Sequence, residues 1–297
     1  MVRPRQLRFG VSPDTLSEEE QKSVTHGDFW IPEEARQVYR LALETVNRAQ
    51  VPCVVAGAFA IYEHTGIYRQ TKDLDLLFEP RDLLRAAYAL DEAGFELKLE
   101  EPHWLAKAFR GDVYVDLIYG MGNGVAFIDR AWHEFAKPGT LAANPVMIAP
   151  AEELIWHRLF IHERHRQDMS DIQHLILSEG DTLDWDRLLK RVGPHWPLLL
   201  AQLQIFSYVY PGFRSRIPRH IMDVLLDRAR DQAGKDDPET ALTNGPLISK
   251  FSFAIDTKEW GFFDTRAERV RRASNSEPVQ QIASDPIWSR TRERAGA

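Results

Sequence analysis

The sequence has only one cysteine, Cys53, and this residue lies in an apolar run. A single cysteine excludes an intrachain disulfide framework and a zinc site made of several cysteines. Such cysteine use is typical of a reducing compartment, and we therefore expect a cytoplasmic location. No apolar run approaches the ~20 residues of a membrane-spanning helix. The basic start of the chain also lacks the apolar core of a signal peptide, so we expect no membrane partner.

Positive charge is scarce as well, because 37 Lys and Arg stand against 44 Asp and Glu and the formal net charge is −7. This balance argues against a protein that coats nucleic acid, since phosphate contacts need clustered basic side chains. Two arginine-rich stretches, 214–230 and 266–272, could still form local basic grooves. Acids such as Asp223 and Glu268 are interleaved with them, which favours solvated helix faces instead.

The periodicity of the sequence changes near residue 150, in a chain that has neither internal repeats nor low-complexity tracts. Before this point, strand patterns alternate with helical ones, and beyond it the strand pattern nearly disappears. The 297 residues, 44% of them hydrophobic, suffice for two compact domains. We predict an N-terminal arm over 1–30, an α/β domain over 31–149 and a helical C-terminal domain over 150–297.

Within the α/β domain, we predict a small, mixed, mostly antiparallel sheet. Predicted strands cover 51–55, 73–78, 104–109, 113–118 and 146–148, and predicted helices cover 32–50, 58–64, 80–90, 151–164, 168–178, 185–192, 197–208 and 218–232. Arg110-Gly-Asp112 is a turn that joins two of the strands into a hairpin. Residues 247–255 fit either a late strand or a helix end, and the polar tail beyond 274 is expected to fray.

Three aspartates are the candidate catalytic and metal-binding residues. Asp73 and Asp75 are two positions apart in a predicted strand, so both side chains point to one face, about 6.5–7 Å apart along the strand. Asp116 interrupts the apolar strand Val113–Ile118, where an unpaired acid is costly. If the two strands are neighbours, the three carboxylates match a Mg²⁺ site that also binds substrate phosphates.

A glycine turn before a helix is the candidate phosphate-binding element. Val54-Val-Ala-Gly-Ala58 reads as a strand that ends in a turn at a helix start. Gly57 lacks a Cβ atom, so backbone N–H groups at this helix start can approach phosphate oxygens. Arg69 and Lys72 precede the acids and could neutralise the outer phosphates.

These motifs, in this order, resemble the DNA polymerase β-like nucleotidyltransferase superfamily. The pattern is Gly57-Ala58, then Arg69-Gln-Thr-Lys-Asp73-Leu-Asp75, then the isolated strand residue Asp116. Beyond Pro150, the stretches around Arg158 and Arg164-His-Arg-Gln-Asp168-Met-Ser-Asp171 are similar to the abortive-infection type, which is toxin-like. The resemblance covers about residues 50–178. It departs from the pattern where Ala58 replaces Gly or Ser and where Arg158 replaces Lys, which changes a point charge into a planar fork.

The resemblance implies a nucleotidyltransferase fold and Mg²⁺-dependent transfer of a nucleoside monophosphate from an NTP such as ATP, with release of pyrophosphate. The acceptor would be RNA, a protein or a small molecule. Asp73, Asp75 and Asp116 would hold the metal, and Asp116 could also act as general base. Gly57, Ala58, Arg69, Thr71 and Lys72 would hold the triphosphate, while Arg158 and Asp168 would line the far wall of a cleft between the domains.

Three other interpretations remain open. The chain could be a catalytically inactive binding module of the same fold, serving as an antitoxin-like partner. Arg158, Asp168 and Asp171 could instead form a surface salt-bridge ladder. A hydrolytic metal site is the third, because His162 and His165 are at positions i and i+3. It would draw on further residues nearby, namely His157, His174, Glu153 and Glu163.

Overall fold

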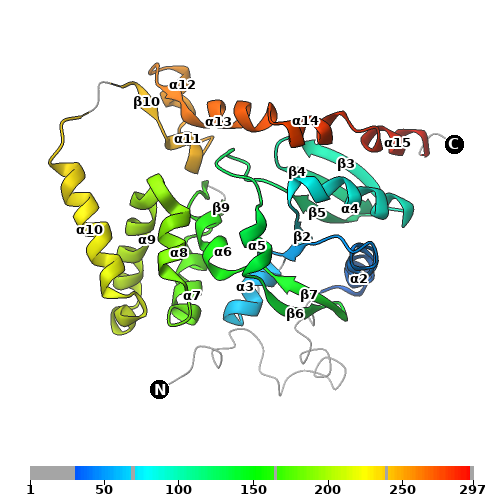
Figure 1. Cartoon of the computed structure of the whole chain (residues 1–297), viewed down its shortest axis with the longest axis horizontal. Helices are drawn as coiled ribbons and strands as arrows, with labels where there is room; N and C mark the ends of the chain where they lie inside the picture. The colour runs from blue at the N-terminus through cyan, green and yellow to red at the C-terminus, as the bar shows by residue number, and fades with distance from the viewer. Residues whose placement is uncertain (1–30, 68–70, 164–165, 238–239, 295–297) are drawn as a thin grey trace. The chain divides into compact units, whose positions relative to one another are not determined.

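The computed structural model describes residues 31–67, 71–163, 166–237 and 240–294 (Figure 1). The chain forms two compact units, and it passes from one to the other after Pro150 and again after Ala267. The first unit contains the main sheet and also includes the described residues from Glu268 onward. The second unit, residues 151–267, is mainly helical.

In the described residues, seven strands form one mixed sheet in the order β3-β4-β5-β2-β1-β7-β6. Their bounds are β1 (Val54–Val55), β2 (Asp73–Leu77), β3 (Glu96–Glu101), β4 (Leu105–Arg110), β5 (Val113–Ile118), β6 (Lys137–Leu141) and β7 (Asn144–Ile148). The pairs β2–β5 and β1–β7 are parallel, and the other four are antiparallel. The prediction of a mixed, mostly antiparallel sheet followed by helices is confirmed.

Alternation of side chains explains why β2 and β5 lie at the centre of the sheet. Leu74 and Leu76 of β2, like Val115 and Leu117 of β5, are fully buried on one face, while the aspartates point to the other. Strands β3 and β6 were not predicted. The alternating Glu96-Leu-Lys-Leu99 does carry the period of a half-buried strand, whereas β6 contains a proline and a glycine that weaken its pattern.

Helices α2 (Glu33–Arg48), α3 (Gly57–Thr65), α4 (Pro80–Glu92) and α5 (Arg130–Glu134) belong to the same unit. Helices α2 and α4 contact each other, and each buries an apolar stripe: Val38, Ala42 and Val46 on α2, and Leu83, Ala87 and Leu90 on α4. Pro80 is the first residue of α4, where its missing N–H costs nothing. Helices α2, α3 and α4 begin and end close to the predicted bounds, whereas α5 was not predicted.

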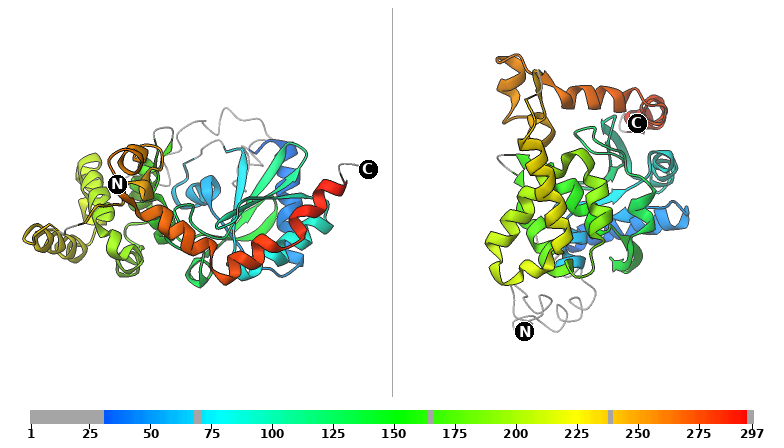
Figure 2. Two further views of the ribbon diagram at one scale, coloured as in Figure 1. Left: turned by 90° about the horizontal axis from the view of Figure 1, so that it is seen from above. Right: turned by 60° about the vertical axis from the view of Figure 1, so that its left-hand side comes forward.

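The last two helices pack on this unit, so the prediction of a frayed tail is wrong. Helix α14 (Glu277–Ser284) contacts α4, and α15 (Ile287–Arg294) contacts β3 (Figure 2). Val279, Ile282 and Ile287 are buried, and the Tyr88 hydroxyl donates to Asp285 Oδ1 at 2.9 Å. Only a few apolar residues stand among many polar ones here, and tertiary packing rather than a strong sequence pattern orders the segment.

The second unit is built on five longer helices: α6 (Ala151–Arg158), α7 (Met169–Glu179), α8 (Trp185–Val192), α9 (Trp196–Val209) and α10 (Arg219–Ala233). Helix α6 ends earlier than predicted, and a ring nitrogen of His162 lies 3.1 Å from the Leu159 carbonyl just beyond it. The short pairs β8 (His162–Glu163) with β9 (Arg166–Gln167) and β10 (Leu242–Thr243) with β11 (Phe263–Asp264) follow. Residues 247–255 fall mostly between two short helices, α11 (Gly245–Ile248) and α12 (Ala254–Lys258), rather than in a strand.

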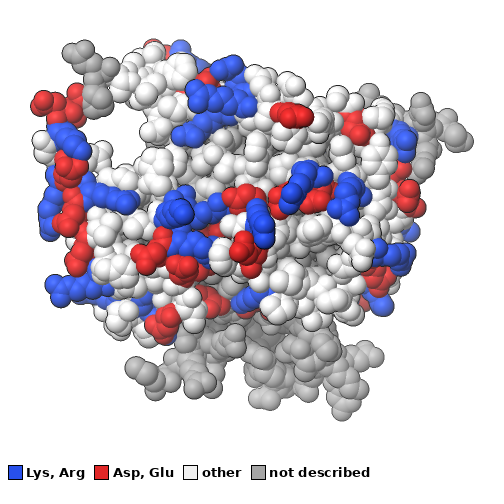
Figure 3. Space-filling model, in the orientation of Figure 1, with Lys and Arg blue, Asp and Glu red and all other residues white. Residues whose placement is uncertain are grey.

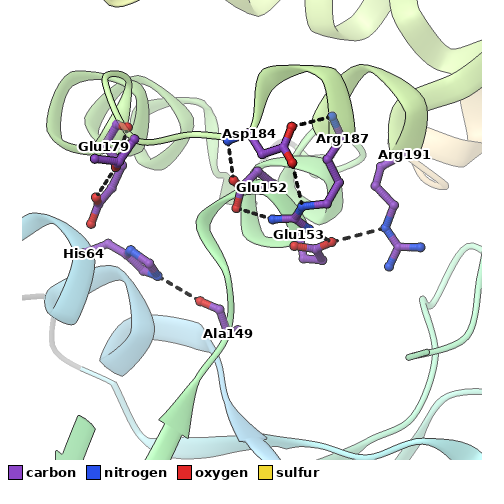
Figure 4. A network of polar contacts seen from close by, with 9 residues as sticks. His64, Ala149, Glu152, Glu153, Glu179, Asp184, Arg187 and Arg191 are labelled. Carbon is purple, nitrogen blue, oxygen red and sulfur yellow. Dashed lines mark hydrogen bonds and ion pairs between the residues drawn. The ribbon is translucent and has the colours of Figure 1, made fainter. Parts of the chain in front are cut away.

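A buried charge network fastens α8 to α6 in this unit. Figure 4 shows Glu152 and Glu153 of α6 directed toward Arg187 and Arg191 of α8. Arg187 pairs with Glu152 at 2.7 Å and also with Glu153, and Arg191 Nε lies 3.3 Å from Glu153 Oε1. Glu153 is fully buried, and this burial raises the pKa of its carboxyl, although the hydrogen bond and the charge of Arg187 act to lower it. In the first unit, a ring nitrogen of His64 lies 2.8 Å from the Ala149 carbonyl oxygen, and the same view shows the ring directed toward that carbonyl.

The arginine-rich stretches carry their own counter-charges, which confirms the preferred interpretation of solvated faces. Arg219 pairs with Asp223 on α10, and Arg271 and Arg272 both pair with Glu268 on α13 (Thr265–Ser274). Acidic and basic side chains are interleaved over much of the face in Figure 3. No helix in the described residues combines the length and the apolar character needed to cross a membrane.

The packing of α14 predicts a stability effect that a frayed tail would not show. Ile282→Ala should lower the free energy of unfolding by about 2–5 kcal/mol, because it removes buried methyl groups. Gln281→Ala changes the exposed neighbouring position and should alter stability by less than about 0.5 kcal/mol. Urea denaturation of both variants measures the difference, and equal midpoints would show that α14 does not pack here.

Candidate active site

The parallel pairing of β2 with β5 brings the acidic residues to one face of the sheet. Asp75 is the register partner of Asp116, and Asp73 lies two residues earlier in β2. Partners on neighbouring strands point to the same face, as do residues i and i+2 of one strand. Asp73, Asp75 and Asp116 therefore share a face, opposite the leucine and valine side chains that fill the core.

Gly57, the first residue of α3, lies directly against Asp75. Its φ is +58°, and a Cβ atom placed on it would be 1.7 Å from Asp75 Oδ2. Any other residue would clash with the carboxylate and would also strain the left-handed backbone. The Ala56 N–H donates to the Asp75 carbonyl at 3.0 Å, which joins the start of α3 to β2. As at any helix start, the first N–H groups of α3, including those of Gly57 and Ala58, lack an intrahelical acceptor. The side chain of Ala56 does not cap them.

Asp73 is held by a residue just before its own strand. The Thr71 hydroxyl donates to Asp73 Oδ1 at 2.6 Å, so this threonine orients the carboxylate in the present arrangement. Lys72 is exposed. Arg69, the remaining predicted triphosphate residue of this segment, lies outside the described residues.

Asp116 is paired with Lys107, a residue that the sequence analysis did not single out. Lys107 of β4 is the register partner of Asp116, and its Nζ donates to Asp116 Oδ1 at 2.5 Å. Asp116 is 8% exposed, and this burial raises the pKa of its carboxyl, an effect that Lys107 opposes. The predicted three-residue turn, 110–112, would set residue 106 opposite Asp116, so it missed this pair. With Arg110 opposite Val113, counting three residues along each strand puts position 107 opposite 116.

Two tyrosines surround the acids and were also missed. Tyr39 of α2 is almost fully buried, and burial together with the negative charges of Asp73 and Asp75 raises the pKa of its phenol. Tyr114 of β5 is the register partner of Asp73, and burial and the Asp73 charge raise its pKa as well. Both phenols therefore stay protonated at neutral pH.

The three carboxylates are ligands of the kind that a hard cation prefers, although Asp73 is bonded to Thr71 and Asp116 to Lys107. Carboxylate oxygens on one face suit Mg²⁺. In the part of the chain that the structure describes, no three His, Cys, Asp or Glu side chains are gathered closely enough to hold a metal ion.

Arg158 and Asp168, predicted to line a cleft, belong to a buried ion cluster within the helical unit. Arg158 Nε lies 3.1 Å from Asp171 Oδ2 and 3.9 Å from Asp168 Oδ2, and all three residues are buried. The surface-ladder interpretation is therefore wrong about exposure, although the pairing itself exists. The cluster joins α6 to the start of α7. That Arg158 and Asp168 face the acids of β2 stays a prediction.

The acids needed by the hydrolytic alternative have other partners. Glu163 accepts hydrogen bonds from Ser249 Oγ at 2.6 Å and from the Lys250 N–H at 2.9 Å. Glu153 belongs to the arginine network described above. His165 lies outside the described residues.

Comparison with known proteins gives a family match. A model of a family described as uncharacterised nucleotidyltransferase matches residues 41–199, more than half of the chain. A search of curated proteins gave no significant match.

Several solved structures resemble the chain weakly. The antibiotic-resistance factor ANT(2'')-Ia in solution is 17% identical over 59% of this chain and 97% of its own, with a TM-score of 0.41. The lincosamide antibiotic adenylyltransferase LnuA with lincomycin bound is 13% identical over 54% and 96%, with a TM-score of 0.33. A putative nucleotidyltransferase from H. pylori is 15% identical over 82% and 98%, also at 0.33. Because these scores are below 0.5, the assignment depends on the family match.

The contact between Gly57 and Asp75 predicts a difference between two glycine substitutions. Gly57→Ala and Gly66→Ala both place an alanine at positive φ, which costs roughly 1–2 kcal/mol. At Gly66 no atom lies within 4 Å of the added Cβ, whereas at Gly57 the Asp75 carboxylate must move. Gly57→Ala should therefore be the more destabilised variant in chemical denaturation. Equal losses would mean that the carboxylate moves away without cost.

The buried ion cluster predicts a large effect of removing its cation. Arg158→Met removes the cation that pairs with two buried carboxylates and should cost about 3–5 kcal/mol of unfolding free energy. Arg219→Met, which removes an exposed ion pair of α10, should cost less than about 1 kcal/mol. Both are measured by urea unfolding. Similar small losses would show that the Arg158 cluster is not a structural element.

Proposed function

This chain belongs to the family of uncharacterised nucleotidyltransferases, and we propose that it transfers a nucleoside monophosphate from an NTP to an acceptor. The observation that supports this most directly is the register of β2 and β5, which sets Asp75 beside Asp116 with Asp73 on the same face. Carboxylates gathered on one face beside a helix start suit a reaction that moves highly charged phosphates.

In this proposal, Asp73 and Asp75 hold Mg²⁺, and Asp116 completes the site. Bound there, Mg²⁺ would supply positive charge that neutralises the triphosphate and the departing pyrophosphate. The acceptor oxygen attacks the α-phosphorus, and the bond from that phosphorus to the bridging oxygen breaks. Pyrophosphate leaves, and the proton of the acceptor passes to the Asp116 carboxylate, which acts as general base.

The triphosphate is proposed to lie at the start of α3, on the N–H groups of Gly57 and Ala58. These donors are pre-positioned and, with the helix dipole, favour a negative charge. Lys72 and Arg69 add positive charge from the segment before β2. Thr71, which bonds to Asp73, is better suited to orienting that metal ligand than to binding phosphate itself.

The helical unit has a different part in the proposal. Arg158 pairs with both Asp168 and Asp171 inside the unit, so we assign Arg158 and Asp168 to holding α6 against α7. In this role the two residues would stabilise the helical unit and would not contact the reacting groups. We propose a cytoplasmic enzyme of the toxin-like, abortive-infection type, acting on a hydroxyl or phosphate of RNA, a protein or a small molecule.

A second candidate function is a catalytically inactive module that serves as an antitoxin-like partner. The ion pair between Lys107 and Asp116 favours it, because that pair neutralises the proposed general base. Incubation with each α-labelled NTP and a cell extract separates the two functions. An enzyme labels RNA, protein or a small molecule and releases pyrophosphate, whereas a binding module does neither.

Asp75→Asn tests the proposed role of the acid at the centre of the site. The change keeps size and shape but removes charge, so pyrophosphate release should fall on the order of 10²-fold or more. Without metal, the melting temperature should stay the same or rise, because one of several repelling carboxylates is removed.

Asp112→Asn, in the exposed turn between β4 and β5, is the matched control and should change neither quantity. A clearly lower metal-free melting temperature for Asp75→Asn would indicate a structural acid. It would contradict the catalytic assignment.

A further inference from the structure

A row of charged side chains crosses four neighbouring strands and ends at the acids. Lys98 of β3, Lys107 of β4, Asp116 of β5 and Asp75 of β2 are successive register partners. Lys98 is exposed and pairs with Glu100 of its own strand at 2.9 Å. Lys107 is largely covered, with 17% of its side chain exposed, and its Nζ is bonded to Asp116. The two lysines therefore offer a matched comparison, one exposed at the sheet edge and one inside the row.

Electrostatics explains why Lys107 keeps this position. Three carboxylates on one face repel one another, and a covered ion pair is screened by water less than a surface pair. The Lys107 ammonium also lies 4.0 Å from the centroid of the Tyr114 ring, whose face attracts a cation. One positive charge thus offsets part of the repulsion in the nucleotide-free protein.

We infer that Lys107 is a resident counter-cation of this site, which a divalent cation must displace from Asp116 before it can bind there. The inference rests on the proposed function, in which the same acids hold a metal–nucleotide complex. A divalent cation alone must break the ion pair and leave the ammonium without a partner. An incoming triphosphate brings new negative charge for that ammonium, so cation and nucleotide should bind cooperatively.

Metal binding to Lys107→Met tests the inference without any measurement of activity. Methionine keeps a long flexible chain but carries no charge. Free Mn²⁺ is followed by electron paramagnetic resonance at pH 8, with and without a non-hydrolysable NTP. Removal of the competing charge should tighten binding of Mn²⁺ alone by about tenfold or more. The nucleotide should then improve Mn²⁺ affinity less than it does in the wild type.

Lys98→Met and Lys107→Arg are the controls. The first removes an exposed lysine one strand away, and the second keeps the charge, so both should bind Mn²⁺ as the wild type does. Metal-free Lys107→Met should also melt at a lower temperature, because Asp116 loses its partner, and Mn²⁺ should raise that temperature more than in the wild type. Lys107→Gln takes its place if the methionine variant does not fold.

Two results would contradict the inference, and they can be told apart from each other. If the wild type binds Mn²⁺ with nucleotide but Lys107→Met binds Mn²⁺ alone no more tightly, Lys107 is not a competitor and this inference is wrong. If no variant, the wild type included, binds Mn²⁺ or NTP, the proposed function fails and the inference fails with it.

Discussion

Mutual repulsion of three carboxylates on one face of two parallel strands is the constraint around which the sheet unit is arranged. Because β2 and β5 run parallel and in register, Asp75 and Asp116 are side by side and cannot avoid each other by turning to the opposite, apolar face. Each acid has a specific neighbour. Thr71 donates to Asp73, Gly57 leaves room for Asp75, and Lys107 neutralises part of the charge at Asp116.

In the helical unit, buried acids are paired with arginines. This contrast supports a functional interpretation of the three acids on the sheet. Glu153 has two arginines from α8, and Arg158 stands between Asp168 and Asp171. In those clusters, cations and acids are present in comparable number. On the sheet, three acids share one face and Lys107 pairs with Asp116, an arrangement of neighbouring carboxylates that is typical of functional sites.

Local patterns predicted most of this unit but not its side-chain partners. The alternation in Asp73-Leu-Asp75-Leu and the apolar strand around Asp116 identified β2, β5 and the acids, because period and charge are both visible in the sequence. That the two strands pair in parallel depends on tertiary packing, which no local pattern contains. Lys107 is the instructive miss, since hairpin counting places it opposite Asp116 only when Arg110 pairs with Val113, which leaves a two-residue turn in place of the predicted 110–112. The docking of α14 could not be predicted, because two buried side chains among polar neighbours give a weak pattern.

The central claim is that these three acids form one metal–nucleotide site. Diffraction from crystals grown with Mn²⁺ and a non-hydrolysable NTP, recorded at the manganese absorption edge, tests it most directly. The account predicts an anomalous peak bonded to carboxylate oxygens of Asp73 and Asp75, with the triphosphate at the N–H groups of Gly57 and Ala58 and with Lys107 moved away from Asp116. Nucleotide bound at another surface, or manganese bound without contact to either acid of β2, would contradict the account.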